Sequence, residues 1–98
     1  MITAVLQDNI HQTLEICSRA GNERYLLQSG DGYRTLSELC QVDNAVFARS
    51  DMTGLIDELN VLRQGLNPAD QEHVDEIIRL AMRCRDEDGL ILAFTPFL

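Results

Sequence analysis

Residues 50–85, SDMTGLIDELNVLRQGLNPADQEHVDEIIRLAMRCR, contain two consecutive amphipathic patterns around which the rest of the chain is organised. Within each pattern, apolar residues recur at the offsets that a helix with one buried face requires. Gly65 to Pro68 separates the two patterns, and Asn67 followed by Pro68 is a typical helix start. The apolar stripes are Leu55, Ile56, Leu59, Leu62 and Leu66, then Val74, Ile77, Ile78, Ala81 and Cys84. The stretch therefore predicts two helices.

The first twenty residues also follow a helical period. Arg19 suits the last turn of a helix, where a cation interacts favourably with the helix dipole, and Gly21 is a typical C-terminal stop. The apolar face comprises Val5, Leu6, Ile10, Leu14 and Cys17. This pattern predicts a third main helix over residues 2–20.

Three short apolar or aromatic stretches predict strands. They cover residues 24–28, 45–49 and 90–95, and the last contains the uninterrupted apolar run Leu90 to Phe94, with Pro96 ending the strand. A continuous apolar run indicates a strand that is covered on both faces or is central in its sheet. Ser50 or Asp51 is the expected N-cap of the helix that follows residues 45–49.

Residues 29–48 allow more than one interpretation. The turn signal at residues 29–32 predicts a hairpin with a return strand at Tyr33, whereas Thr35 and Glu38 form a capping box that predicts a short helix over residues 36–40. A rival interpretation continues one helix from residue 36 to residue 47. Periodicity alone does not distinguish these alternatives in segments this short.

These elements predict one α+β domain over residues 1–98. A small, mostly antiparallel sheet of about three strands would pack against three main helices. The alternative is an all-α domain with a single C-terminal strand. A chain of 98 residues is long enough to form one hydrophobic core without disulfides or metals.

The charge of the chain disfavours two classes of partner. Acidic residues outnumber basic residues 16 to 8, and the net charge is −8. A chain with this charge is not expected to bind nucleic acid or an anionic membrane surface, whereas it would attract a basic protein. No stretch has the apolar length of a membrane span and the N-terminus lacks signal-peptide features, so we expect a cytoplasmic protein.

No motif for catalysis, metal binding or cofactor binding is found. The three cysteines have no C-x-x-C spacing and lie in or beside apolar stripes, so they are expected to be reduced core thiols. His11 and His73 have no ligand-spaced partner, and the loop at residues 86–89 lacks the later carboxylate of a calcium loop. We therefore expect a non-enzymatic protein without a cofactor, although a small enzyme using Cys40 or His73 is an alternative.

The acidic residues of the two helices are the candidate partner-binding residues. Residues 67–98 contain seven acids and three arginines, so this segment carries half of the net charge. An acidic helical face would accelerate association with a basic partner and select it. The docking carboxylates are predicted to be Asp57, Glu58, Glu72, Asp75 and Glu76. Asp75 is also spaced to form an i, i+4 pair with Arg79.

Residues 49–94 resemble small cytoplasmic immunity proteins of bacterial polymorphic toxin systems. The resemblance comprises Arg49-Ser50-Asp51-Met52, Leu55-Ile56-Asp57-Glu58-Leu59 with Leu62, Ile77-Ile78-x-Leu80-Ala81-x-x-Cys84, and the strand Leu90 to Phe94. It implies an inhibitor that blocks a basic toxin, and no toxin-binding residue is carried over. The alternative function is a homodimeric structural or assembly subunit, or a secretion chaperone.

Overall fold

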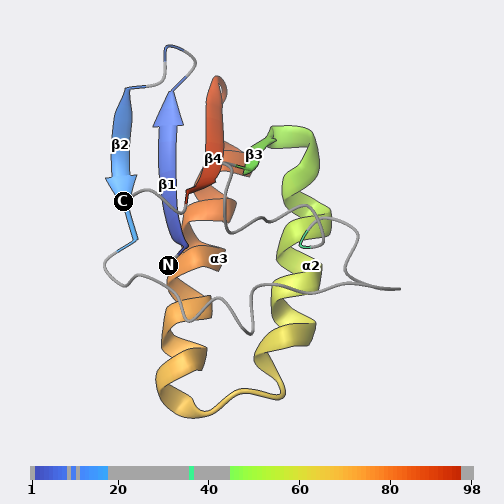
Figure 1. Cartoon of the computed structure of the whole chain (residues 1–98). Coiled ribbons are helices and arrows are strands. Elements are labelled where there is room, and N and C mark those ends of the chain that lie inside the picture. Colours follow the sequence, from blue (N-terminus) through green and yellow to red (C-terminus); the bar gives the residue numbers. More distant parts are fainter. Residues whose placement is uncertain (1, 9, 11, 18–35, 37–44, 96–98) are drawn as a thin grey trace.

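An antiparallel sheet and a helical hairpin form the two layers of the computed structural model (Figure 1). The structure describes residues 2–8, 10, 12–17, 36 and 45–95. Within them, the sheet has four strands in the order β2-β1-β4-β3. The strands are β1 (Thr3–Asp8), β2 (Thr13–Ile16), β3 (Ala45–Ala48) and β4 (Leu90–Thr95). The fold is therefore α+β, with the predicted strands at residues 45–49 and 90–95 both present.

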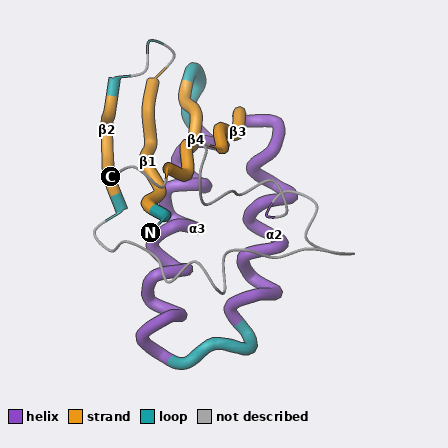
Figure 2. The backbone as a smooth tube through the Cα atoms, viewed as in Figure 1, coloured by secondary structure: helices purple, strands orange, loops and turns teal. Residues whose placement is uncertain are grey.

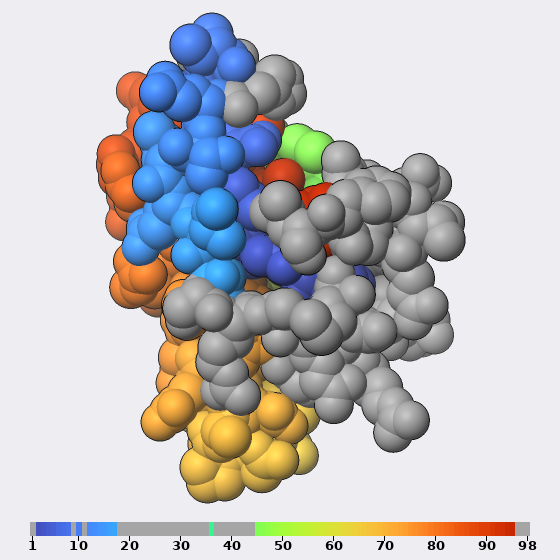
Figure 3. Space-filling model, turned by 60° about the vertical axis from the view of Figure 1, so that its left-hand side comes forward, coloured from blue at the N-terminus to red at the C-terminus, as the bar shows by residue number. Residues whose placement is uncertain are grey.

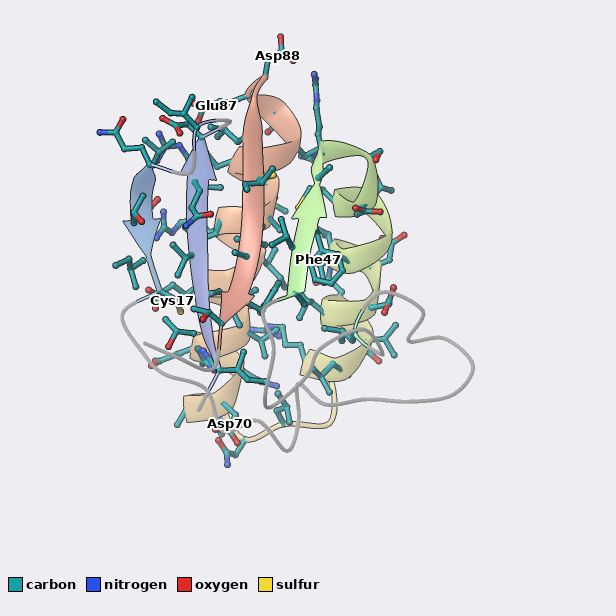
Figure 4. All side chains as sticks on the ribbon, turned by 45° about the horizontal axis from the view of Figure 1, so that its top comes forward. Cys17, Phe47, Asp70, Glu87 and Asp88 are labelled. Carbon is teal, nitrogen blue, oxygen red and sulfur yellow. The ribbon has the colours of Figure 1, made fainter. Side chains whose placement is uncertain are left out.

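Two helices cover one face of the sheet in the part of the chain that is described (Figures 1 and 4). A short 3-10 turn (η2, Arg49–Asp51) leads from β3 into α2 (Met52–Arg63), and α3 (Pro68–Asp86) runs back toward β4. The loop between α2 and α3 lies at the end of the molecule opposite the turn between β1 and β2 (Figure 2). Both helices predicted from residues 50–85 are confirmed.

The ends of the helices follow their sequence signals, with one change. Asn67 caps α3, because its Oδ1 accepts a hydrogen bond from the Asp70 amide at 2.9 Å. Asp51 is the N-cap of α2, but its carboxylate accepts from the upstream Ala48 amide at 3.0 Å. Gly89 follows α3 with a φ of 77°, a left-handed conformation that glycine adopts without strain, and turns the chain into β4.

The core lies between the sheet and the two helices. Residues alternate between the two faces of a strand, so Leu6 of β1, Leu92 of β4 and Phe47 of β3 point toward the helices and are buried. Phe47 and Phe94 meet edge to face with their ring centroids 5.8 Å apart. On the helices, the core contains the residues of the predicted stripes together with Met52 and Leu80, which the stripes did not include, and Leu66 is only partly buried at the margin.

The predicted helix over residues 2–20 is wrong. Within this segment, Thr3–Asp8 and Thr13–Ile16 form the hairpin of β1 and β2, in which Val5 pairs with Ile16 and Leu6 with Glu15. Asp8 sets the turn, since its Oδ1 accepts hydrogen bonds from the amides of Ile10 and Gln12 at 3.0 and 2.9 Å. β1 is buried on both faces over Thr3 to Leu6, so its apolar run lacks the alternation that indicates a strand.

The predictions for residues 18–44 are tested at one position only. The strand at residues 24–28, the return strand at Tyr33 and the helix over residues 36–40 fall outside the described residues, apart from Leu36, which is buried. The rival helix over residues 36–47 is wrong at its C-terminal end, because residues 45–47 belong to β3.

Candidate protein-binding surface

The candidate carboxylates lie on the helical layer, where α2 and α3 present their polar faces. Asp57 of α2 and Glu72 of α3 are exposed, and Glu76 is half-buried. They are placed outward because the apolar stripes of both helices turn inward to the core. Asp57 and Glu72 therefore have the exposure that a docking carboxylate requires.

Glu58 is not on this surface, and its predicted exposure is wrong. Glu58 is only 8% exposed, and its Oε1 accepts a hydrogen bond from the backbone amide of Leu36 at 2.9 Å. A buried amide without an acceptor is costly, so this bond gives Glu58 a structural role. Glu58 lies in the sequence between the exposed Asp57 and the core residue Leu59.

Asp75 is exposed, but an arginine balances its charge. Its two carboxylate oxygens accept from Nε and Nη2 of Arg63 at 2.6 and 3.0 Å, which ties the end of α2 to α3. The hydrogen bond to Asp75 raises the pKa of Arg63 above its ordinary value. The i, i+4 spacing predicted that Asp75 pairs with Arg79. In the structure, Asp75 instead pairs with Arg63 across the helical hairpin.

Glu15 joins the sheet to α3 by two ion pairs. Its carboxylate contacts Nη2 of Arg79 at 2.7 Å and Nη1 of Arg83 at 3.4 Å. The hydrogen bond from Arg79 is the main reason that the pKa of Glu15 lies below its usual value. The sequence did not reveal this contact, because residue 15 reaches α3 only once β2 has paired with β1.

Every arginine in the described residues takes part in an ion pair. Arg83 also contacts Glu87 at 2.7 Å, and Arg85 contacts Asp86 at 2.9 Å. Arg49 pairs with Asp88 and donates from Nε to the Arg85 carbonyl oxygen at 2.7 Å. The arginines of this set are Arg49, Arg63, Arg79, Arg83 and Arg85. No arginine among them is left to neutralise further acids.

Several carboxylates of the helices have no arginine partner in the described part of the chain. Asp57, Asp70 and Glu72 form no ion pair within the described residues. Asp70 and Glu72 lie near the N-terminus of α3, where the helix dipole favours negative charge. Figure 4 shows Asp70 at one end of the molecule and the arginine-paired Glu87 and Asp88 at the other.

The described thiols and the described histidine lie in the core. Cys17, His73 and Cys84 are buried, and the Cys84 Sγ donates to the Leu90 carbonyl oxygen at 3.5 Å. Burial raises the pKa of Cys84, which keeps it in the protonated form that is a poor nucleophile. Across the described part of the chain, no group of three or more His, Cys, Asp or Glu residues is placed to hold a metal ion.

Comparison with known proteins gives no information on function, so the acidic helical surface is the main guide. No protein-family model matches the chain, and no curated protein and no solved structure matches it either. Neither α2 nor α3 is long and apolar enough to cross a membrane, nor is any other helix in the described residues.

Proposed function

We propose that this protein is a non-enzymatic binding domain that neutralises a basic protein partner in the cytoplasm, in the manner of an immunity or inhibitor protein. One observation carries the proposal: Asp57 and Glu72 are exposed and form no ion pair within the described residues. Because each described arginine is already paired, these carboxylates can be neutralised by cations that a partner supplies. Asp75 and Glu76 follow Glu72 on α3, whereas Glu58 is excluded from the docking set by its burial.

The net charge of the whole chain also favours binding of a basic partner. A net charge of −8 attracts a basic protein from a distance and accelerates its encounter with the helical layer. Exposed charges of this kind mainly change the association rate and its dependence on salt, and contribute less to the lifetime of the complex. Binding that uses this surface should therefore weaken as ionic strength rises.

The first test is a charge reversal at the unpaired carboxylates. A protein captured from the native lysate by the wild type would be identified by mass spectrometry, and its association rate measured by surface plasmon resonance at low and high salt. We expect the double variant Asp57→Lys/Glu72→Lys to lower this rate by about tenfold or more at low salt, and to flatten its salt dependence.

The double variant Asp86→Lys/Asp88→Lys is the matched control. It changes the net charge by the same amount, but at acids that arginines already pair, and Asp88 lies at the far end of the molecule from Asp70 (Figure 4). The control should slow association much less than the test variant. If the two variants have equal effects, or if association ignores both salt and charge reversal, docking on the helical layer is refuted.

A second candidate function, a homodimeric assembly or secretion-chaperone subunit, is favoured by a different feature. β2 lies at an edge of the described sheet and carries exposed apolar side chains. Exposed apolar side chains grouped on one element are typical of a protein interface.

A further inference from the structure

Arg63 at the end of α2 contacts the Asp75 carboxylate of α3 through two parallel hydrogen bonds. Nε donates to Oδ1 at 2.6 Å, and Nη2 donates to Oδ2 at 3.0 Å. This arrangement requires a planar guanidinium, because the ammonium group of a lysine is a point charge without a fork of donors. The two oxygens of Asp75 are therefore presented in the geometry that recognises arginine.

The turn of the helical hairpin has contacts that do not involve this ion pair. The Leu66 amide and the Gln71 side chain both donate to the Arg63 carbonyl oxygen at 3.1 Å. Leu62, the preceding residue, lies in the core. These contacts use the backbone and the apolar face of α2, so they remain in place when the Arg63 guanidinium leaves Asp75.

Both members of the pair are accessible from solvent. The side chains of Arg63 and Asp75 are 38% and 49% exposed. Figure 3 shows the end of the helical hairpin, in yellow, at the surface of the molecule. Exposed ion pairs contribute little to stability, because water solvates both charges when the pair separates. An external guanidinium can therefore replace Arg63 at little cost to the fold.

Asp75 also lies beside a carboxylate that has no arginine partner in the described part of the chain. Glu72 is three residues earlier in α3, and residues three apart are neighbours on one face of a helix. Glu72 is exposed and forms no ion pair within the described residues. A basic segment attracted to Glu72 comes within reach of Asp75, where Arg63 is the competing cation.

We propose that Asp75 is an arginine-selective subsite of the docking surface, which Arg63 occupies in the free protein and an arginine of the basic partner occupies in the complex. This inference rests on the proposed function and specifies its partner, whose contacting segment carries arginine rather than lysine where it meets Asp75. Arg63 is then an autoinhibitory contact, because the partner's arginine must displace it.

Two short peptides of equal charge test the selectivity. Capped tetra-arginine and capped tetra-lysine would be titrated into the full chain, while NMR follows the Asp75 carboxylate carbon and the Arg63 Nε–H. We expect tetra-arginine to bind at Asp75 at least about threefold more tightly, because only arginine reproduces the two parallel hydrogen bonds. The Arg63 Nε–H signal should move toward that of a solvated arginine as tetra-arginine saturates the site.

Removal of the competing cation tests the autoinhibitory contact. Arg63→Gln should tighten tetra-arginine binding, measured at the Asp75 carbon, by about twofold to fivefold, which is the range expected for loss of an exposed pair. Arg85→Gln is the matched control, because it changes the net charge equally and breaks another exposed pair, with Asp86, at the C-terminal end of α3. It should change binding at Asp75 much less, and circular dichroism would verify that both variants are folded.

The proposal is overturned if tetra-arginine produces no saturable shift at Asp75, if the two peptides bind there equally, or if Arg63→Gln and Arg85→Gln have equal effects. Each of these results is distinct from failure of the proposed function, which the Asp57→Lys/Glu72→Lys variant tests with the captured partner. The subsite can fail while that variant still slows association. Conversely, selective binding of tetra-arginine at Asp75 is retained if partner association ignores Asp57 and Glu72.

Discussion

At the scale of single residues, Asp57 and Glu58 show how far neighbouring carboxylates can diverge. Both are acids on α2, but Asp57 faces solvent and Glu58 is buried against the backbone of Leu36. The helical period placed Asp57 correctly, because its exposure follows from its position opposite the apolar stripe. The environment of Glu58 could not be predicted, because its hydrogen-bond partner lies 22 residues away in the sequence.

Substitution of Glu58 should reveal this structural role. We expect Glu58→Ala to lower the free energy of unfolding by about 1–3 kcal/mol, because it leaves a buried amide without its acceptor. Glu58→Gln keeps an acceptor oxygen and should cost less. The measurement is urea denaturation followed by circular dichroism. Asp57→Ala, the exposed neighbour, should change stability by less than about 0.5 kcal/mol, and an equal loss in both variants would contradict the assignment.

At the scale of elements, the helical hairpin and the strand hairpin differ in how much local sequence specifies them. α3 has a cap, a proline at its first turn and an unbroken apolar stripe, and all three act within the helix itself. The hairpin of β1 and β2 depends on a turn at Asp8 and on pairing of β1 with β4. Strand pairing with a segment more than 80 residues away leaves no local signal, so a helical period in the same residues was misleading.

The cap of α3 gives a prediction at this scale. Asn67→Ala removes the side-chain acceptor for the Asp70 amide and should lower the free energy of unfolding by about 1 kcal/mol. Asn60→Ala, on the exposed face of α2, is the matched control, because it makes the same substitution in a helix interior. Alanine has the higher helix propensity, so the control should be neutral or stabilising by less than about 0.7 kcal/mol. Thermal unfolding of both variants would show whether the loss of stability is specific to the cap position or follows from replacing any helical asparagine.

The ion pairs of Glu15 predict a pH dependence for the contact between β2 and α3. Because the pKa of Glu15 is lower in the folded state than its ordinary 4.5, its contribution to stability is complete above that value and is lost as pH falls through the folded pKa. Glu15→Gln should therefore be less stable than the wild type at neutral pH, and the difference should shrink in acid.

Urea denaturation at a series of pH values would measure this difference. Asp86, whose pKa Arg85 lowers, is present in both proteins, so its own acid response cancels in the comparison. A difference between Glu15→Gln and the wild type that is constant from neutral pH to well below 4.5 would contradict the ion-pair assignment.

At the scale of the whole molecule, one core couples the sheet to both helices. Phe47 of β3 and Leu92 of β4 share this core with residues of α2 and α3, and Phe47 also packs on Phe94. Domains of this size with a single core usually unfold cooperatively, so a defect in the core should affect all elements together.

Adjacent residues of β3 allow a direct test of this coupling. Phe47→Ala should lower the free energy of unfolding by about 3–5 kcal/mol, whereas Val46→Ala, which changes an exposed side chain on the other face, should cost less than about 1 kcal/mol. Circular dichroism would follow the helices, and amide exchange in β1 and β4 would follow the sheet. In Phe47→Ala, both signals should be lost at the same denaturant concentration, and separate transitions would show that the layers unfold independently.

The sequence by itself determined the helical hairpin, the strands at residues 45–48 and 90–95, the α+β class and the acidity of the helical layer. These features depend on short-range periodicity, capping and composition, which act between residues close together in the chain. Only the tertiary structure decided that residues 3–16 form a strand hairpin, that Glu58 is buried, and which carboxylates the arginines neutralise. Each of these depends on contacts between distant segments, so the free energy of assembling the sheet and the core outweighs local preference.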